Sequence, residues 1–131
     1  TLFPGVTELL AAIDRKGLVW GIVTNKPQEF AEAIAASTPA MARCAIVVGS
    51  RPGVPLKPAP DGILRALKEL ALKPEQTLYT GDDRRDIEAG KAAGTSTLLA
   101  LWGYRPKDAD TSLWAPDFTA SSPEDIIRLL P

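Results

Sequence analysis

The 131-residue sequence contains no histidine and only one cysteine, Cys44. The lack of histidine removes the commonest general base and the commonest transition-metal ligand, so histidine-assisted nucleophilic triads and histidine-bearing zinc sites are excluded. A single cysteine cannot form a disulfide within the chain. Any catalysis must therefore use aspartate, glutamate, lysine and hydroxyl groups.

The sequence also lacks an apolar run of membrane-spanning length, a signal-peptide pattern and any block of like charges. Fifteen basic and sixteen acidic residues leave a formal net charge of −1, which argues against nucleic acid or a membrane surface as a partner. A chain of this length with 45% hydrophobic residues suits one globular domain. The single cysteine and the lack of targeting segments predict a cytoplasmic location.

Helical periodicity and strand-length apolar runs alternate along the chain. They predict helices at residues 6–16, 27–37, 63–70, 87–93 and 123–130, and strands at 18–24, 44–48, 77–80, 97–101 and near 118. This alternation predicts a three-layer, Rossmann-like α/β domain with a mainly parallel sheet. The continuous apolar run at 18–24 predicts a strand buried on both faces. No strand precedes the first helix, as though a leading strand were missing.

Polar side chains stand at three loop ends in this pattern. Thr24 and Asn25 follow the first expected strand, Lys57 precedes the third helix, and Asp82 and Asp86 follow the third strand. The carboxyl ends of parallel strands form a crevice in which ligands bind. There a hydroxyl and nearby amides can bind phosphoryl oxygens, a lysine can neutralise charge, and carboxylates can hold Mg²⁺. We therefore predict a magnesium-dependent phosphate site at this edge.

Each of these residues also has a purely structural interpretation. Thr24 could cap the following helix, and Lys57 could be a solvated surface lysine. Asp83 is expected to be a helix N-cap that forms a capping-box-like pair with Asp86. Asp82 is then the better metal ligand, and Asp86 is assigned an orienting role.

The order and spacing of these residues resemble the haloacid dehalogenase superfamily. Residues 23–25 (VTN), 57–58 (KP) and 81–86 (GDDRRD) look like its second, third and fourth motifs. Residues 20–27 (WGIVTNKP), residues 86–94 (DIEAGKAAG) and the stretch from Trp102 through Asp117 are similar to phosphoglycolate and N-acetylmuramic acid 6-phosphate phosphatases. The phosphoglycolate phosphatase-like branch therefore fits best.

The resemblance implies a Mg²⁺-dependent phosphomonoesterase that acts on a small phosphorylated metabolite through an aspartyl-phosphate intermediate. It assigns Thr24 and Lys57 to catalysis, Thr24, Asn25 and Lys57 to phosphate binding, and Asp82 and Asp86 to the metal. The first motif, which supplies the nucleophilic aspartate, and the helical cap would precede Thr1. Residues 1–131 are thus expected to form a single partial core domain, inactive alone because a covalent nucleophile is missing. Because the cap reads the leaving group, phosphoglycolate and a phosphosugar remain equally open as substrates.

Residues 108–111 (DADT) superficially match the missing first motif. We reject them as the nucleophile because residues 104–107 (YRPK) precede them instead of a buried apolar run. The loss of a central strand would leave unpaired edges on the strands that carry Thr24 and Asp82. We expect these strands to close up, to be completed by another chain through self-association or complementation, or to be completed by a preceding segment.

Three rival functions remain at this point. The chain could be a non-catalytic phosphate- or protein-binding scaffold module that has kept the same fold. A dinucleotide-binding module is disfavoured because no Gly-x-Gly-x-x-Gly fingerprint follows any expected strand. A receiver-like phosphorylation domain would need an acidic pair at its first strand, and none is visible.

Overall fold

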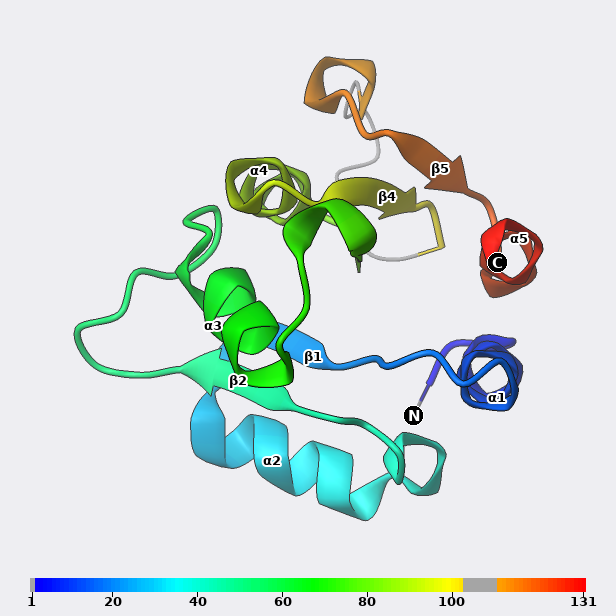
Figure 1. Cartoon of the computed structure of the whole chain (residues 1–131), viewed down its shortest axis with the longest axis horizontal. Helices are drawn as coiled ribbons and strands as arrows, with labels where there is room; N and C mark the ends of the chain where they lie inside the picture. The colour runs from blue at the N-terminus through cyan, green and yellow to red at the C-terminus, as the bar shows by residue number, and fades with distance from the viewer. Residues whose placement is uncertain (1, 103–110) are drawn as a thin grey trace.

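The computed structural model describes residues 2–102 and 111–131, in which helices and strands alternate (Figure 1). The elements are α1 (Val6–Arg15), β1 (Ile22–Pro27), α2 (Gln28–Ser37), β2 (Val47–Ser50), α3 (Asp61–Leu70), β3 (Leu78–Gly81), α4 (Arg84–Ala93), β4 (Ser96–Ala100), β5 (Phe118–Ala120) and α5 (Pro123–Leu129), with short 3-10 turns at Pro39–Met41, Pro74–Gln76 and Thr111–Trp114. The predicted α/β class is confirmed. Residues 103–110, which include most of the rejected DADT segment, lie outside the described residues.

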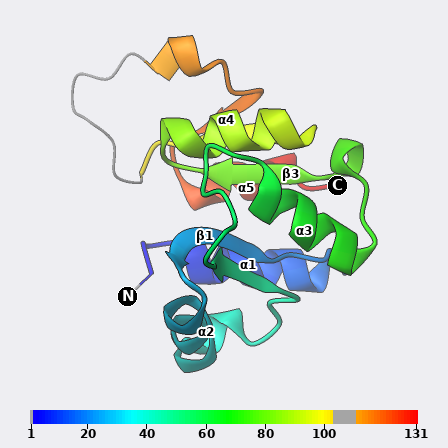
Figure 2. The same ribbon diagram turned by 90° about the vertical axis from the view of Figure 1, so that its left-hand side faces the viewer.

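Every strand pairing in the described part of the chain is parallel, as predicted, but the strands form two sheets. One sheet has the order β1-β2 and the other the order β3-β4-β5. Figure 2 shows the part that contains β3 and α4 above the part that contains β1 and α2. Because β1 and β3 do not pair with each other, the expectation that these two strands close up is wrong. The other two ways of completing the edges remain predictions.

Helices cover both sheets and bury two apolar clusters. The first joins α1, β4, β5 and α5 through Leu9, Leu98, Ala120 and Ile126, and Figure 1 shows α1 and α5 near each other beside these strands. The second joins α3 and α4 through Ile63, Leu67, Ala89 and Ala93, with Val23 of β1 and Tyr79 of β3 packed against it. The second cluster therefore connects the two sheets beneath the predicted site. No described helix is long and apolar enough to cross a bilayer.

The first strand is less buried and begins later than predicted. The apolar run 18–24 was expected to lie buried on both faces, yet Val19 exposes 56% of its surface and β1 begins only at Ile22. Backbone pairing extends further, because Ala45 N donates to Trp20 O at 2.8 Å. Among the described residues, β1 has one neighbouring strand, so its other edge and parts of its faces stay uncovered. The full burial predicted for this strand is therefore wrong.

The second strand, expected at 44–48, also begins later in the chain than predicted. β2 covers Val47–Ser50, and only Val48 in it is buried. The helix expected at 27–37 begins at Gln28, with Pro27 as its N-cap. The other predicted helices lie within a few residues of their expected positions, because turn and capping residues mark their ends.

Candidate functional site

The Lys57 ammonium is the centre of the site. Its Nζ atom donates to Asp86 Oδ1 at 2.6 Å, to Tyr79 Oη at 3.1 Å and to Val23 O at 3.2 Å. A lysine ammonium carries three N–H donors, and these three acceptors are enough to engage all of them. Lys57 thereby joins the loop before α3 to β1, β3 and α4.

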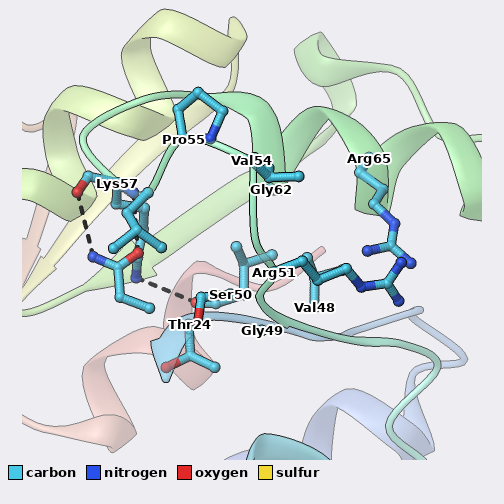
Figure 3. A pocket seen from close by; sticks show the side chains of 13 residues that line it. Thr24, Val48, Gly49, Ser50, Arg51, Val54, Pro55, Lys57, Gly62 and Arg65 are labelled. Carbon is cyan, nitrogen blue, oxygen red and sulfur yellow. Dashed lines mark hydrogen bonds between the residues drawn. The ribbon is translucent and has the colours of Figure 1, made fainter. Parts of the chain in front are cut away.

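Asn25 fixes the backbone of Lys57. Its Nδ2 donates to Lys57 O at 3.3 Å, and its Oδ1 accepts from Lys57 N at 3.0 Å. Figure 3 shows Lys57 beside β1 in this arrangement. Asn25 was predicted to bind phosphate. In the structure its side-chain amide bonds to the backbone of Lys57, in the loop before α3 that we call the lysine loop. These two hydrogen bonds hold the backbone of Lys57 in place.

Asp86 connects the lysine to the turn that follows β3. Its Oδ1 accepts from Lys57, while its Oδ2 accepts from the backbone amides of Asp82 and Asp83, each at 3.2 Å. A Cβ atom at Gly81 would clash with the Cβ of Asp86, so only glycine lets the carboxylate sit against the end of the strand. Both Asp86 oxygens are thus engaged, which fits the orienting role assigned to this residue.

The start of α4 agrees with its sequence prediction. Asp83 is the N-cap: its side chain accepts from Arg85 N at 2.9 Å, and it forms a capping box with Asp86. The hydrogen bond from the Arg85 backbone is the main reason that the pKa of Asp83 lies below its ordinary value. Asp83 therefore belongs to the helix cap, and Asp82 remains the metal candidate in this turn.

Electrostatics keep the lysine charged and the tyrosine neutral at physiological pH. Burial acts to lower the pKa of Lys57, but Tyr79 and Asp86 outweigh burial, and the pKa is raised. Burial raises the pKa of Tyr79, and the opposing effect of Lys57 does not cancel this rise. The site therefore presents a buried cation held by one carboxylate and one neutral phenol.

A cavity of about 310 Å³ lies between β1 and β3, lined in part by Lys57, Tyr79, Asp82 and Asp86. The described residues contain no group of three or more His, Cys, Asp or Glu side chains that could hold a metal ion. Mg²⁺ does not need such a group, because it keeps several waters and binds through one or two carboxylates plus substrate oxygens. Asp82 can supply one such carboxylate at this cavity, whereas both oxygens of Asp86 already accept hydrogen bonds.

A second cavity, of about 30 Å³, lies on another side of the lysine loop and is lined by Thr24, Asn25, Arg51, Lys57 and Arg65 among others. Figure 3 shows the two arginines on the side of this cavity away from Lys57. It has room for about one water molecule. Lys57 therefore lines both cavities, whereas Thr24 lines the smaller and Asp82 the larger.

Thr24 does not cap the following helix. Its Oγ1 accepts from Lys26 N at 3.2 Å, while the N-cap of α2 is Pro27, which makes no side-chain capping bond. The alternative interpretation of Thr24 as a helix cap is therefore wrong. The hydroxyl instead bonds within β1, where the pairing register with β2 shifts between Val23 and Pro27, and its own proton is available for donation.

Sequence reasoning missed Tyr79. This residue lies within the strand expected at 77–80, and its aromatic ring reads as an ordinary packing residue there. The available signal was the strand period, which places Tyr79 on the same face as Gly81, beside the acidic turn. That signal gives the face and not the partners of the hydroxyl, which come from β1 and from the lysine loop.

Comparison with known proteins places the chain in a family. The family model described as haloacid dehalogenase-like hydrolase matches residues 1–100. The chain is 38% identical over 128 residues to an N-acetylmuramic acid 6-phosphate phosphatase from Pseudomonas aeruginosa, an alignment that covers 98% of this chain and 57% of the relative. It is 39% identical over 125 residues to a phosphoglycolate phosphatase from Xanthomonas campestris, covering 95% of this chain and 57% of the relative.

A solved structure of a haloacid dehalogenase-like family hydrolase from Streptococcus pneumoniae superposes with a TM-score of 0.87 at 28% identity, covering 98% of this chain and 60% of that chain. The present chain therefore spans a little over half the length of these relatives. The motifs, the parallel α/β fold and the extent of the matches lead to one assignment. The chain belongs to the haloacid dehalogenase-like hydrolase family.

Proposed function

We propose that this chain supplies the phosphate-, lysine- and magnesium-binding part of a phosphoglycolate phosphatase-like phosphomonoesterase. The observation that carries the proposal is the buried ion pair between Lys57 and Asp86, next to Asp82, at the rim of the cavity between β1 and β3. Strand ends of this kind are where open α/β sheets bind ligands. The names of two relatives, a phosphoglycolate phosphatase and an N-acetylmuramic acid 6-phosphate phosphatase, support a small phosphorylated metabolite as substrate.

Each residue has a distinct task in this proposal. The Lys57 ammonium offsets negative charge on the phosphoryl oxygens in the larger cavity. Thr24 lines only the smaller cavity on the other side of Lys57, so its hydroxyl donates to a phosphoryl oxygen only where the bound group extends past Lys57 toward Thr24. Asn25 holds the backbone of Lys57 in place through its two hydrogen bonds. Asp82 would hold Mg²⁺, with Asp86 orienting the turn around it, and the bound ion would neutralise charge on the phosphoryl group. Phosphoryl transfer depends mainly on such positioning and charge stabilisation.

The nucleophile must come from another group. Among the described residues that line the larger cavity, the only carboxylates are Asp82 and Asp86, and both already have roles. We propose that a strand placed between β1 and β3 brings an aspartate whose oxygen attacks phosphorus as the bond to the leaving alkoxide breaks. Water would then hydrolyse the aspartyl phosphate. The 131-residue chain alone is expected to bind phosphate without turning over substrate.

Two measurements on the purified chain test this proposal. Isothermal titration calorimetry should detect inorganic phosphate binding in the presence of Mg²⁺, and an assay with p-nitrophenyl phosphate should detect no release above background. Robust turnover would contradict the proposed absence of a nucleophile. A silent phosphate titration would contradict the phosphate site itself.

One observation favours a second candidate, a non-catalytic scaffold module. The acceptors around Lys57 already engage its three N–H donors without any ligand, so the arrangement is complete as a structural brace. A scaffold of this type would give a silent titration with phosphate and with Mg²⁺. The calorimetric experiment therefore separates the two functions directly.

A further inference from the structure

The hydroxyl of Tyr79 lies between the Lys57 ammonium and the backbone carbonyl of Val23. Its oxygen accepts from Lys57 Nζ at 3.1 Å, and its own proton is donated to Val23 O at 3.0 Å. Nζ lies 5.6 Å from the ring centroid, on the side of the ring that carries the hydroxyl. One phenol therefore contacts both the cation and one of the cation's other acceptors.

This arrangement matters because Lys57 has no spare donor. An incoming anion can accept from Lys57 only if one of the existing hydrogen bonds is given up. The bond to Asp86 is a 2.6 Å ion pair, whereas the bond to Val23 O is the longest of the three at 3.2 Å. The Val23 carbonyl is thus the acceptor that Lys57 gives up at least cost.

Leaving a half-buried carbonyl without a donor carries a desolvation penalty. Tyr79 removes that penalty, because its hydroxyl already donates to Val23 O and continues to do so when the ammonium turns away. Without this hydroxyl, Lys57 would be the only side-chain donor that the structure shows on Val23 O. The carbonyl would then hold the ammonium in place and compete with the anion.

We propose that Tyr79 is a positioning residue that frees Lys57 for phosphate. Its hydroxyl keeps the Val23 carbonyl hydrogen-bonded, so that Lys57 exchanges that bond for an anion oxygen while Asp86 still anchors it. Val23, Lys57 and Tyr79 all line the cavity between β1 and β3, where the exchange would take place. The inference rests on the proposed function, since the anion is taken to be a phosphoryl group.

The test compares Tyr79→Phe with the wild-type chain by calorimetry, using inorganic phosphate and, in separate titrations, Mg²⁺. In Tyr79→Phe, the N–H that Lys57 gave to the phenol points at the edge of the remaining ring, so the anion still has to displace the bond to Val23 O, which then has no second side-chain donor. Phosphate affinity should therefore fall about tenfold, the equivalent of one unsatisfied hydrogen-bonding group. Mg²⁺ affinity should stay unchanged, because the hydrogen bonds shown for the Tyr79 hydroxyl go to Lys57 and to the Val23 carbonyl. A general structural defect would weaken both. Thr77→Val is the matched control: it removes a hydroxyl just before β3 that donates to Lys73 O at 2.9 Å, away from the site.

A second readout follows the ammonium itself. In a chain labelled with ¹⁵N-lysine, the Lys57 Nζ protons should exchange slowly with water in the wild type, and measurably faster in Tyr79→Phe. Unchanged exchange would overturn the inference, as would wild-type phosphate affinity in Tyr79→Phe. A wild-type chain that binds no phosphate would instead refute the proposed function, and the exchange measurement would still decide whether Tyr79 holds Lys57.

Discussion

The Nζ atom of Lys57 lies 2.6 Å from Oδ1 of Asp86, and only 14% and 11% of the two side chains are exposed. A pair buried to this degree behaves differently from a surface salt bridge, which contributes little to stability. Removing one partner leaves the other charge without compensation in a poorly solvated place. The pair therefore couples the stability of the domain to the chemistry of the site.

Replacement of Lys57 by Met should test this coupling. The variant leaves the Asp86 carboxylate buried without its cation, and we expect the free energy of unfolding to fall by about 3–5 kcal/mol. Urea denaturation followed by circular dichroism measures this loss. Lys68→Met is the control, because Lys68 is an exposed residue of α3. Equal stability of the two variants would show that the buried pair contributes nothing.

The double variant Lys57→Met with Asp86→Asn should recover part of the loss. It removes both charges together, and replacing a buried ion pair as a whole is often close to neutral. The side-chain carbonyl oxygen that the asparagine brings can still accept from the turn amides. Recovery of stability without recovery of phosphate binding would separate the structural role of the pair from its proposed role in binding.

Stability should decline at high pH. The folded state raises the pKa of Lys57 above its ordinary value of 10.5 and that of Tyr79 above 10.0. A raised pKa means that the folded protein keeps protons that the unfolded chain has begun to lose. The resulting stabilisation is complete below about pH 10 and is lost as the pH rises through the folded-state pKa values.

Urea denaturation at a series of pH values from neutral to strongly alkaline measures this decline in the free energy of unfolding. Tyr79→Phe removes one of the two titrating groups, so its unfolding free energy should depend less steeply on pH in the alkaline range. A stability that stays flat or increases through this range would contradict the direction of both shifts.

Asn25→Ala should loosen the lysine loop. The Asn25 amide makes two hydrogen bonds to the backbone of Lys57. Its removal leaves Lys57 N without this acceptor and Lys57 O without this donor. We expect a loss of about 1–3 kcal/mol in the free energy of unfolding, together with weaker phosphate binding in calorimetry. Asn25→Asp keeps the acceptor for Lys57 N but places a carboxylate oxygen against Lys57 O, so this variant should also lose stability and phosphate affinity. An Asn25→Ala variant with wild-type phosphate affinity would contradict the positioning role.

The sequence was most informative where local chemistry sets the structure. Asp83 was predicted as the N-cap of α4, and the structure has it there; the helix ends at Gly94, which lies in the left-handed region at φ 85°. Such signals depend on a few neighbouring atoms. The positions of Lys57 and Asp86 at loop ends followed from the same kind of pattern.

The sequence predicted that Lys57 and Asp86 lie at one edge of the sheet, but not the individual hydrogen bonds formed there. The bond between Lys57 and Asp86 joins residues 29 apart, and the bond from Tyr79 to Val23 joins residues 56 apart. An apolar run likewise does not show what will cover it, which is why full burial was predicted for the strand at 18–24. In the described structure, β1 has one strand neighbour, and the predicted single sheet is in two parts.

The uncovered edges of β1 and β3 lead to the last prediction. Unpaired strand edges are templates for pairing with another chain, and the two edges face the same cavity. We expect the chain to self-associate, so that its weight-average mass in sedimentation equilibrium rises above 14.0 kDa with concentration.

A lysine on an edge strand blocks such pairing, so Thr80→Lys on β3 should hold the mass at the monomer value. Thr119→Lys on β5, the opposite end of that sheet, is the matched control. If Thr119→Lys alone prevents association, the contact lies at the outer edge of the sheet and not at the central cavity. If the wild-type chain stays monomeric at every concentration, self-association is excluded and only completion by a different segment remains.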